Sequence, residues 1–560
     1  MRSSGDGEIQ IARRMKAPIG EKEDPQGNEN LSAEEQNTPT TPVRKKKHLS
    51  FYLSFLALNI STIIVSLDAT ALAVAIPKIT RELHGTTLEA FWSNLSFMLT
   101  VVISQPVYAS VSDVLGRKPP FYTGFAIFFI GSIVFAVAKS MPVLIVGRLL
   151  QGLGGGGLDV LSEVILADIT TLQERPLYLG LLALPMAGGG VCGPIVGAAL
   201  TEYVTWRWIG WINLPLCALG FFLTVFCLHL QPLDEPLRGR FRRLDWLGFV
   251  GFAVGSTAFA LPLSWAGVLY PWSSWKTILP FTLGFLVLIA CAFYESKPAP
   301  IFPHRIFQNG TAAATILGAT LHGMILYSVM LYVPLYFQAV MLTTSIRSAI
   351  LVLPGSATII ASSILAAIIV EVYRKYRWII ICNWVIASCG VGLWTLWTPD
   401  SSVAQIAGLQ VFAGIGIGTV FTALTIPNQT SVADVNDYGI AAGVLVCFRL
   451  FGGLIGLALC AGVFNNVFER RISTLEFIPH ELEMLMNVRE AISFIPTLRE
   501  INLEHGILSP ILEVYSQCFK AVFWTLTGTG ALGLLTSFFI EDLTLEKTDI
   551  GRQQFVADVG

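Results

Sequence analysis

Long apolar segments, separated by short polar ones, fill the chain from residue 51 to residue 540. A helix that crosses a hydrocarbon core of about 30 Å needs about 20 apolar residues. By this length the pattern predicts fourteen membrane-spanning helices, and therefore an all-α membrane protein. The predicted spans are 51–77, 90–111, 119–138, 141–168, 177–201, 208–230, 245–265, 276–294, 311–339, 347–371, 378–397, 402–426, 438–465 and 518–540.

The composition agrees with this pattern. Hydrophobic residues make up 53% of the 560 residues and charged residues only 13%, and the mean hydropathy is +0.64. A soluble chain of this size needs about a quarter charged residues, so much of the surface must face lipid. A net charge of −2 gives no positive electrostatic field that would attract nucleic acid. The protein is instead predicted to lie in a lipid bilayer.

Basic residues near the predicted spans indicate the orientation of the chain. The first 47 residues are polar and end in the run Arg44–Lys47. A cleavable signal peptide would place its apolar segment nearer the start, so residues 1–49 are predicted to be a disordered cytoplasmic tail. With this tail inside, the cytoplasmic connections hold sixteen Lys and Arg residues against ten on the other side. The positive-inside rule therefore predicts that both termini are cytoplasmic. We expect a multi-pass protein of the cell membrane or the vacuolar membrane.

Residues typical of enzymes and metal sites do not gather in the sequence. The nine cysteines include no C-x-x-C pair, and the seven histidines form no cluster with metal-ligand spacing. The glycine run 154–157 lies in a predicted span and no G-K-[S/T] follows it, so it is not a phosphate-binding loop. The sequence predicts a protein that is not an enzyme and holds no cofactor or metal. Any transport that it carries out is expected to be driven by an ion gradient rather than by ATP.

Charged residues with a defined spacing follow the second predicted span. The sequence from 109 to 118 reads A-S-V-S-D-V-L-G-R-K and contains Asp113, Gly116, Arg117 and Lys118. A carboxylate and two cations at a helix end can pair with each other and cap neighbouring helix termini. Such contacts can hold two half-molecules together in one state and release them in another.

Glycine patterns mark the fourth and fifth predicted spans. The fourth reads G-R-L-L-Q-G-L-G from residue 147 and includes Arg148 and Gln151. An arginine within an apolar helix costs about 2.5–3.5 kcal/mol on insertion scales, so Arg148 is expected to face a cavity or a partner. Small residues at regular spacing let helices approach closely, and proline adds a kink. In the fifth span these residues are Gly180, Gly189, Gly193, Pro194 and Gly197.

These three patterns resemble signatures of the major facilitator superfamily, namely G-x-L-A-D-R-x-G-R-K, R-x-x-Q-G-x-G and G-x8-G-x3-G-P-x2-G-G. The first departs from its signature at Ala109 and Val114, and the third at Ala198. The third signature implies export in exchange for protons. Together with segments 67–77 and 206–215, the patterns resemble the fourteen-span drug:proton antiporter branch over about residues 50–540, and the long last outer loop resembles fungal toxin and multidrug efflux pumps. The resemblance also implies that Asp168 and Arg175 belong to the same cytoplasmic gate as Asp113, Gly116, Arg117 and Lys118.

The resemblance further implies the major facilitator fold, with two six-helix bundles around a midplane site. The bundles are expected at residues 50–230 and 310–540, the second including an outer loop at 468–517. The linker 231–309 would carry two inserted helices, and 541–560 would form a cytoplasmic tail. An internal repeat supports this division, because the glycine pattern at 408–416 echoes 147–154, with Leu409 in place of Arg148.

Few ionisable residues lie within the predicted spans. At 100° per residue, Arg148 and Asp159 fall within about 20° on one helix face, with Glu163 one turn beyond. A carboxyl group that moves between buried and aqueous surroundings can load and release a proton. Asp68, Asp159 and Glu163 are therefore the predicted proton carriers. Arg148, with Gln151 beside it, is expected to tune them, and the alternative for Arg148 and Asp159 is a static clamp between helices.

Two further residues in the predicted spans each allow two interpretations. His322 is either a proton relay or substrate donor, or a histidine satisfied by its structural surroundings. Arg449 either contacts substrate or clamps a facing carbonyl group. Both are retained as candidate residues of the proton-coupling and substrate cavity.

The function predicted from the sequence is proton-coupled export, by alternating access, of a small and largely apolar compound such as a fungal secondary metabolite, toxin or drug. The protein is expected to work as a monomer. An importer of the same superfamily, such as a siderophore–iron:proton transporter, is the alternative. A channel is disfavoured because the sequence contains no repeated filter loop.

Overall fold

A computed structural model describes residues 47–84, 87–171, 174–230, 245–266, 270–294, 304–432, 437–475, 495–500 and 505–543. Every helix named below belongs to one compact unit, residues 48–560. Several predicted segments fall outside the described residues: the tail up to residue 46, the linker at 231–244, most of the outer loop and the tail beyond residue 543.

Helices of the N-terminal half follow the first six predicted spans. Proline in the first turn, where no backbone N–H is needed for helical bonding, marks the start of α3, α4 and α5. The sixth predicted span is divided at Ile212 into a short helix and a longer one. The helices are α1 (Leu49–Glu82), α2 (Thr87–Leu115), α3 (Lys118–Ala136), α4 (Met141–Ile169), α5 (Arg175–Tyr203), α6 (Trp208–Trp211) and α7 (Asn213–Cys227).

Two apolar helices, α9 (Trp246–Trp265) and α10 (Trp275–Phe293), occupy the predicted insertion. Side-chain caps define their starts: Asp245 accepts a hydrogen bond of 2.8 Å from Gly248 N, and Ser274 accepts one of 3.4 Å from Lys276 N. The two helices pack against each other, and α9 also contacts α2 and α16. Helix α9 thus contacts one helix from each half.

Helices of the C-terminal half occupy the last six predicted spans, but two are longer than predicted. Helix α16 continues to Ile472 through a turn that carries Glu469, Arg470 and Arg471, and α18 begins at His505, well before the predicted start. The elements are η1 (His304–Ile306), α11 (Gly310–Ala339), α12 (Ser345–Tyr373), α13 (Arg377–Leu393), η2 (Trp394–Leu396), α14 (Val403–Ala423), α15 (Thr425–Thr430), α16 (Tyr438–Ile472), α17 (Ile495–Glu500) and α18 (His505–Ser537).

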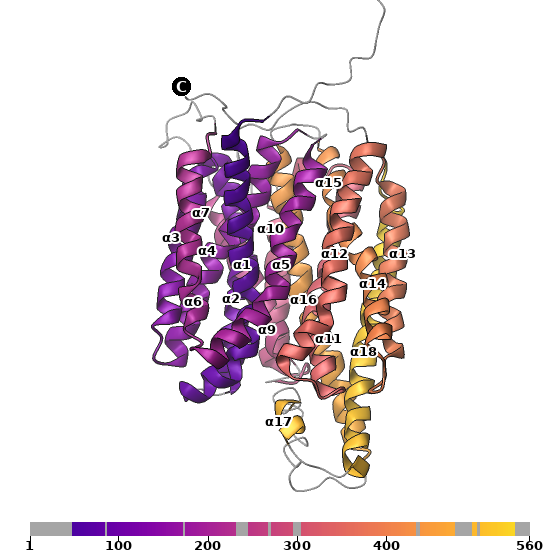
Figure 1. Cartoon of the computed structure of the whole chain (residues 1–560). Coiled ribbons are helices and arrows are strands. Elements are labelled where there is room, and N and C mark those ends of the chain that lie inside the picture. The colour runs from indigo at the N-terminus through magenta and orange to yellow at the C-terminus, as the bar shows by residue number, and fades with distance from the viewer. Residues whose placement is uncertain are drawn as a thin grey trace, which may run out of the picture. The chain divides into compact units, whose positions relative to one another are not determined.

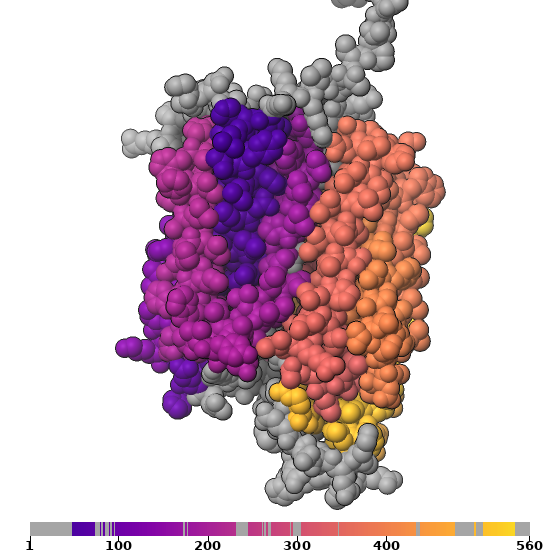
Figure 2. Space-filling model, viewed as in Figure 1, coloured from indigo at the N-terminus to yellow at the C-terminus, as the bar shows by residue number. Residues whose placement is uncertain are grey.

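The long helices run roughly parallel and form two bundles side by side (Figure 1). Among the described residues, twelve helical segments are long and apolar enough to cross a membrane, and shorter apolar stretches lie at 246–259 and 275–291. Each half has its own apolar core, with Phe121 and Phe128 in the first and Tyr336 and Phe523 in the second. In the space-filling view the indigo-to-magenta half lies directly against the orange half (Figure 2). Their contacts involve α5 with α12, and α16 with α2 and α4.

Glycines of the predicted antiporter pattern bring α5 against α1. A Cβ atom on Gly189 or Gly193 would lie 2.0 Å from the hydroxyl oxygen of Ser66 or Thr70. At Gly197 it would lie 2.1 Å from the backbone oxygen of Ala71, which cannot move aside as a side chain can. Pro194 lies within the same helix. Gly180 faces α12 instead, where an added Cβ would lie 3.1 Å from the Ala367 methyl group. The pattern is therefore a close-packing surface, mainly for α1.

The first prediction concerns this contact. Gly197→Ala should lower the free energy of unfolding by about 1–3 kcal/mol, because the added methyl group forces the two helices apart. Gly188→Ala is a matched control on the same helix, since a Cβ at Gly188 meets no atom within 4 Å. Thermal unfolding of both purified variants in detergent checks this, and equal Tm values for the two would contradict it.

Candidate functional site

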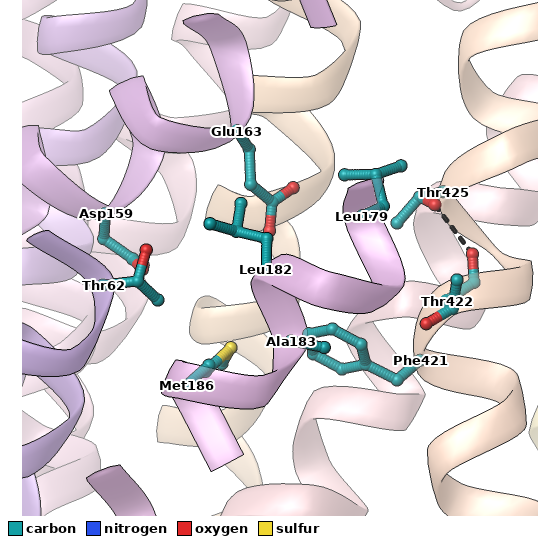
Figure 3. Close-up of a pocket in the computed structure, with 10 residues that line it drawn as sticks. All are labelled: Thr62, Asp159, Glu163, Leu179, Leu182, Ala183, Met186, Phe421, Thr422 and Thr425. Carbon is teal, nitrogen blue, oxygen red and sulfur yellow. Dashed lines mark hydrogen bonds between the residues drawn. The ribbon is translucent and has the colours of Figure 1, made fainter. Parts of the chain in front are cut away.

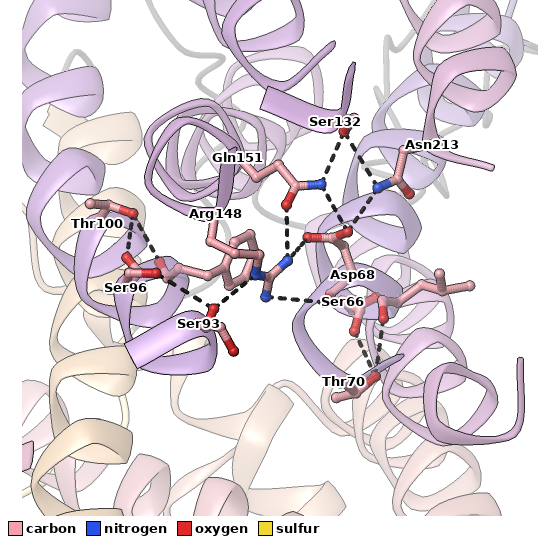
Figure 4. Close-up of polar contacts among 12 residues, drawn as sticks. Ser66, Asp68, Thr70, Ser93, Ser96, Thr100, Ser132, Arg148, Gln151 and Asn213 are labelled. Atoms are coloured by element: carbon pink, nitrogen blue, oxygen red, sulfur yellow. Dashed lines mark hydrogen bonds and ion pairs between the residues drawn. The ribbon is translucent and has the colours of Figure 1, made fainter. Parts of the chain in front are cut away.

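A buried polar network ties together four helices of the N-terminal half (Figure 4). Asp68 of α1 forms an ion pair with Arg148 of α4. The other Asp68 oxygen accepts hydrogen bonds from Gln151 Nε2 at 3.1 Å and Asn213 Nδ2 at 2.8 Å. Gln151 Nε2 also donates to Ser132 Oγ of α3 at 3.1 Å. Both carboxylate oxygens of Asp68 are thus occupied, and the ion pair is fully buried.

Arg148 also donates to Gln151 Oε1 at 3.1 Å and to the Asp68 carbonyl oxygen at 3.4 Å, and it contacts α2 as well. Its Nε donates to the Ser93 carbonyl oxygen at 3.2 Å, and its guanidinium carbon lies 4.3 Å from the centre of the Phe97 ring. The predicted clamp between Arg148 and Asp159 is not formed. The two residues share a helix face, but eleven residues separate them, or about 16 Å along the axis. Arg148 therefore pairs with a residue of α1 instead.

The two other predicted carriers, Asp159 and Glu163, line a pocket between the halves (Figure 3). Gln105 Nε2 of α2 donates to Asp159 Oδ2 at 2.8 Å. One oxygen of Glu163 is buried without a hydrogen-bond partner among the described residues. The rest of the lining is mostly apolar and comes from both halves: Thr62, Leu179, Leu182, Ala183, Met186, Phe421, Thr422 and Thr425.

A cation from the C-terminal half acts on these carboxylates. Arg449 of α16 interacts electrostatically with both Asp159 and Glu163, and Tyr327 of α11 is within reach of the same charges. Arg449 Nη2 also donates to the Phe421 carbonyl oxygen at 3.0 Å, and its guanidinium carbon lies 4.0 Å from the centre of the Phe421 ring. The clamp to a facing carbonyl group is thus present, next to the pocket.

His322 of α11 is buried beside the same α14 segment. Its Nε2 lies 2.9 Å from the Ile417 carbonyl oxygen, and its ring packs against Phe421 with 5.9 Å between centroids. Its Nδ1 has no hydrogen-bond partner among the described residues. The histidine is therefore held at one nitrogen only.

The predicted gate residues gather where α2 and α4 end. Arg117 Nε donates to Asp168 Oδ2 at 2.7 Å, and Arg117 Nη1 donates to Ser112 Oγ at 2.9 Å. Arg117 Nη2 lies 3.7 Å from Asp113 Oδ1. Although burial opposes the charge of Arg117, the two carboxylates raise its pKa above the ordinary value. Gly116 directly precedes Arg117 and has a φ of 90°, in the left-handed region. Lys118 is the first residue of α3.

Arg175 connects this cluster to the C-terminal half. Its Nη1 donates to Gln429 Oε1 of α15 at 2.8 Å, and its guanidinium carbon lies 5.2 Å from the centre of the Tyr438 ring of α16. Its Nη2 donates to the carbonyl oxygens of Ala167 and Thr170 in its own half. Gly439 completes the contact, because a Cβ there would lie 2.8 Å from Arg117 Nη2. The two halves therefore meet directly at the predicted cytoplasmic end.

Several of these partners were not predicted. No sequence pattern links Gln429, Tyr438 or Gly439 to Arg175 and Arg117, which lie far away in the chain. Asn213 lies in the segment 206–215 that carries the family resemblance, so its position could have been suspected. No group of three or more His, Cys, Asp or Glu residues that could hold a metal ion occurs among the described residues.

The second prediction concerns the Asp68 network. Asp68→Asn should destabilise the protein by about 3–5 kcal/mol, because it leaves the Arg148 charge buried without its counter-ion. Adding Arg148→Gln should recover part of this loss. Thermal unfolding in detergent measures both effects, with Asp400→Asn in an exposed turn as the control. If the double variant were less stable than Asp68→Asn, the ion pair would not be the source of the effect.

Comparison with known proteins identifies the family. The Major Facilitator Superfamily profile matches residues 58–457. The MFS-type transporter sphD of Aspergillus fumigatus is 47% identical over 93% of this chain and 90% of its own length. The MFS-type efflux pump MMF1 of Pseudozyma antarctica is 33% identical over 90% and 92%, and efflux pump FUS6 of Gibberella fujikuroi is 30% identical over 95% and 96%.

The fold agrees with these relatives. The human organic anion transporter MFSD10 superimposes with a TM-score of 0.53 at 13% identity, covering 87% of this chain and 98% of that one. The all-helical architecture with two bundles is thus the major facilitator fold. The chain belongs to the major facilitator superfamily and is a multi-pass membrane transporter.

Proposed function

We propose that this transporter exports a small, largely apolar compound in exchange for protons. The observation that carries the proposal is a mostly apolar pocket between the halves that contains two carboxylates, Asp159 and Glu163. Apolar walls with a few polar groups are typical of sites for small ligands, and this pocket, with room for about 10 Å³, has to widen to admit cargo. Two relatives, MMF1 and FUS6, are named efflux pumps, and the glycine pattern of α5 resembles that of proton-driven exporters.

Of the three predicted carriers, Asp159 and Glu163 are better placed than Asp68. A proton carrier needs an oxygen that is free to accept the proton and a path to water. Three donors occupy the Asp68 carboxylate, whereas one oxygen of Glu163 has no such partner among the described residues. Asp68 then serves to position α1, α4 and α7, and Asp159 and Glu163 exchange the protons.

Arg449 supplies a physical link between protonation and movement. It belongs to the C-terminal half, whereas the carboxylates belong to the N-terminal half. Protonation of Asp159 or Glu163 removes a charge and weakens the attraction between the halves. A ligand, here the proton, shifts a conformational equilibrium only if it binds the two states with different affinities. The attraction between the carboxylates and Arg449 changes as the halves separate, and this gives the proton such a difference.

The gate residues would control access from the cytoplasm. With both termini inside, as the distribution of basic residues predicts, the contact of Arg175 with Gln429 and Tyr438 closes the cytoplasmic end. Uptake of cargo from the cytoplasm requires this contact to break. The moving bodies are then residues 50–230 and 310–540, within one chain that works as a monomer in the cell membrane.

The third prediction tests the carriers. The cargo is first identified by comparing the export of apolar secondary metabolites from cells with and without the protein. In vesicles with an imposed pH gradient, Asp159→Asn and Glu163→Gln should each reduce export of that cargo by at least about tenfold, with unchanged membrane expression. Glu513→Gln, an exposed position on α18, is the control.

Two outcomes count against the proposal. Undiminished pH-driven export in both variants would remove these carboxylates from the coupling. Accumulation of the cargo driven by an inward proton gradient would indicate an importer instead of an exporter.

A further inference from the structure

The residues that follow α18 lie against the C-terminal half. We call residues 538–543 the strap. Within it, Ile540 is fully buried, and Glu541 N donates to Thr311 Oγ1, near the start of α11, at 3.2 Å. The strap therefore joins the end of the last helix to the beginning of α11, at the end of the half where the Arg175 contact lies.

The strap also caps α13. This helix begins at Arg377, and its N-cap residue, Tyr376, makes no side-chain capping hydrogen bond. The first N–H groups of a helix have no partner within the helix, and a carboxylate beside them is favoured by the helix dipole. Asp542 Oδ1 accepts hydrogen bonds from Tyr376 N and Arg377 N, both at 3.0 Å. In return, Arg377 Nη2 donates to the Phe538 carbonyl oxygen at 3.1 Å.

The Tyr376 side chain connects the strap to α15. Its hydroxyl group donates to the Glu541 carbonyl oxygen at 3.0 Å and accepts a hydrogen bond of 2.8 Å from Leu543 N. The same hydroxyl oxygen lies 3.3 Å from Thr430 Oγ1, at the end of α15. Because Tyr376 is fully buried, removal of its hydroxyl group would take one partner from each of these groups. Buried polar groups are costly to leave unpaired.

Helix α15 carries one side of the gate contact. Gln429, which directly precedes Thr430, accepts the hydrogen bond of 2.8 Å from Arg175 Nη1 of the other half. The helix has only six residues, and helices this short are not stable by themselves. Its position therefore depends on its contacts with neighbouring elements, of which the contact with Tyr376 is one.

We propose that Tyr376 is a positioning residue of the cytoplasmic gate. The strap fixes Tyr376, and Tyr376 holds α15 where Gln429 can bind Arg175. This inference rests on the proposed function for the role of the Arg175 contact as a gate, and it adds a control on that contact from the end of the last helix. Release of the strap favours the open cytoplasmic end, although no strap residue touches the N-terminal half or the pocket in any contact described above.

The fourth prediction concerns hydrogen–deuterium exchange of the full-length transporter in lipid nanodiscs, measured by mass spectrometry. Tyr376→Phe should speed exchange by about fivefold in two segments, 425–432 of α15 and 164–171 at the end of α4, because loss of a hydrogen bond raises the population of the open state. Asp542→Ala should have the same effect and should also speed exchange at 376–380, where it removes the cap of α13.

Two controls make the same chemical changes outside these contacts. Tyr373→Phe removes a hydroxyl group from a side chain that is 72% exposed, three residues before Tyr376. Glu541→Ala removes an exposed carboxylate next to Asp542, and it keeps the backbone atoms that contact Tyr376 and α11. Neither control should change exchange in the two gate segments. Segment 380–391, within α13, should keep its exchange rate in every variant.

Arg175→Gln separates this inference from the gate itself. It removes the guanidinium group that joins the halves and should speed exchange in both gate segments. If it does not, the Arg175 contact is no gate, and the proposed closure fails together with the role of Tyr376.

Two results would overturn the role of Tyr376 alone. In the first, Arg175→Gln speeds exchange in both gate segments, but Tyr376→Phe speeds it only at 376–380 and in the strap. Tyr376 would then support its local surroundings without acting on the other half. In the second, Tyr376→Phe speeds exchange throughout the chain, including segment 380–391, which would indicate a general loss of stability.

Discussion

An ionisable side chain inside a membrane requires a partner, and this constraint determines how the transporter is built. Asp68 and Arg148 satisfy each other, and Gln151 and Asn213 complete the shell around the carboxylate. Removal of one partner would leave a buried charge, so the network holds α1, α4 and α7 in fixed relation. The glycine surface of α5 adds a close contact with α1, so α1 is held both by the polar network and by α5.

The N-terminal half also carries charges that face the other half. Asp159 and Glu163 lie on the same helix as Arg148, but they open into the pocket between the halves. Their electrostatic partner, Arg449, comes from the other half. A second cross-half contact joins Arg175 to Gln429 near the predicted cytoplasmic end. The pocket and the Arg175 contact therefore lie between the same two halves of the chain.

The sequence predicts the helices well because lipid imposes one simple rule, a minimum length of apolar residues. Helices lie at all fourteen predicted ranges, and twelve described segments meet the rule while the apolar stretches at 246–259 and 275–291 are shorter. The rule misses the end of α16, the start of α18 and the break at Ile212. Local motifs identify the residues of the Arg117 cluster because they are close to one helix end. Helical geometry places Arg148 and Asp159 on one face but about 16 Å apart along the axis, and it says nothing of a partner for Arg148 on α1. Contacts such as Arg175 with Gln429 join positions far apart in the chain, and only the packing of the two halves reveals them.

The central claim is that Asp159 and Glu163 exchange protons for cargo at one shared site. Its most direct test is the number of protons released when cargo is added to the purified transporter in weakly buffered solution. The wild type should release protons on binding. The Asp159→Asn/Glu163→Gln double variant should bind the same compound, more weakly, with no release. Undiminished proton release by the double variant would contradict the claim.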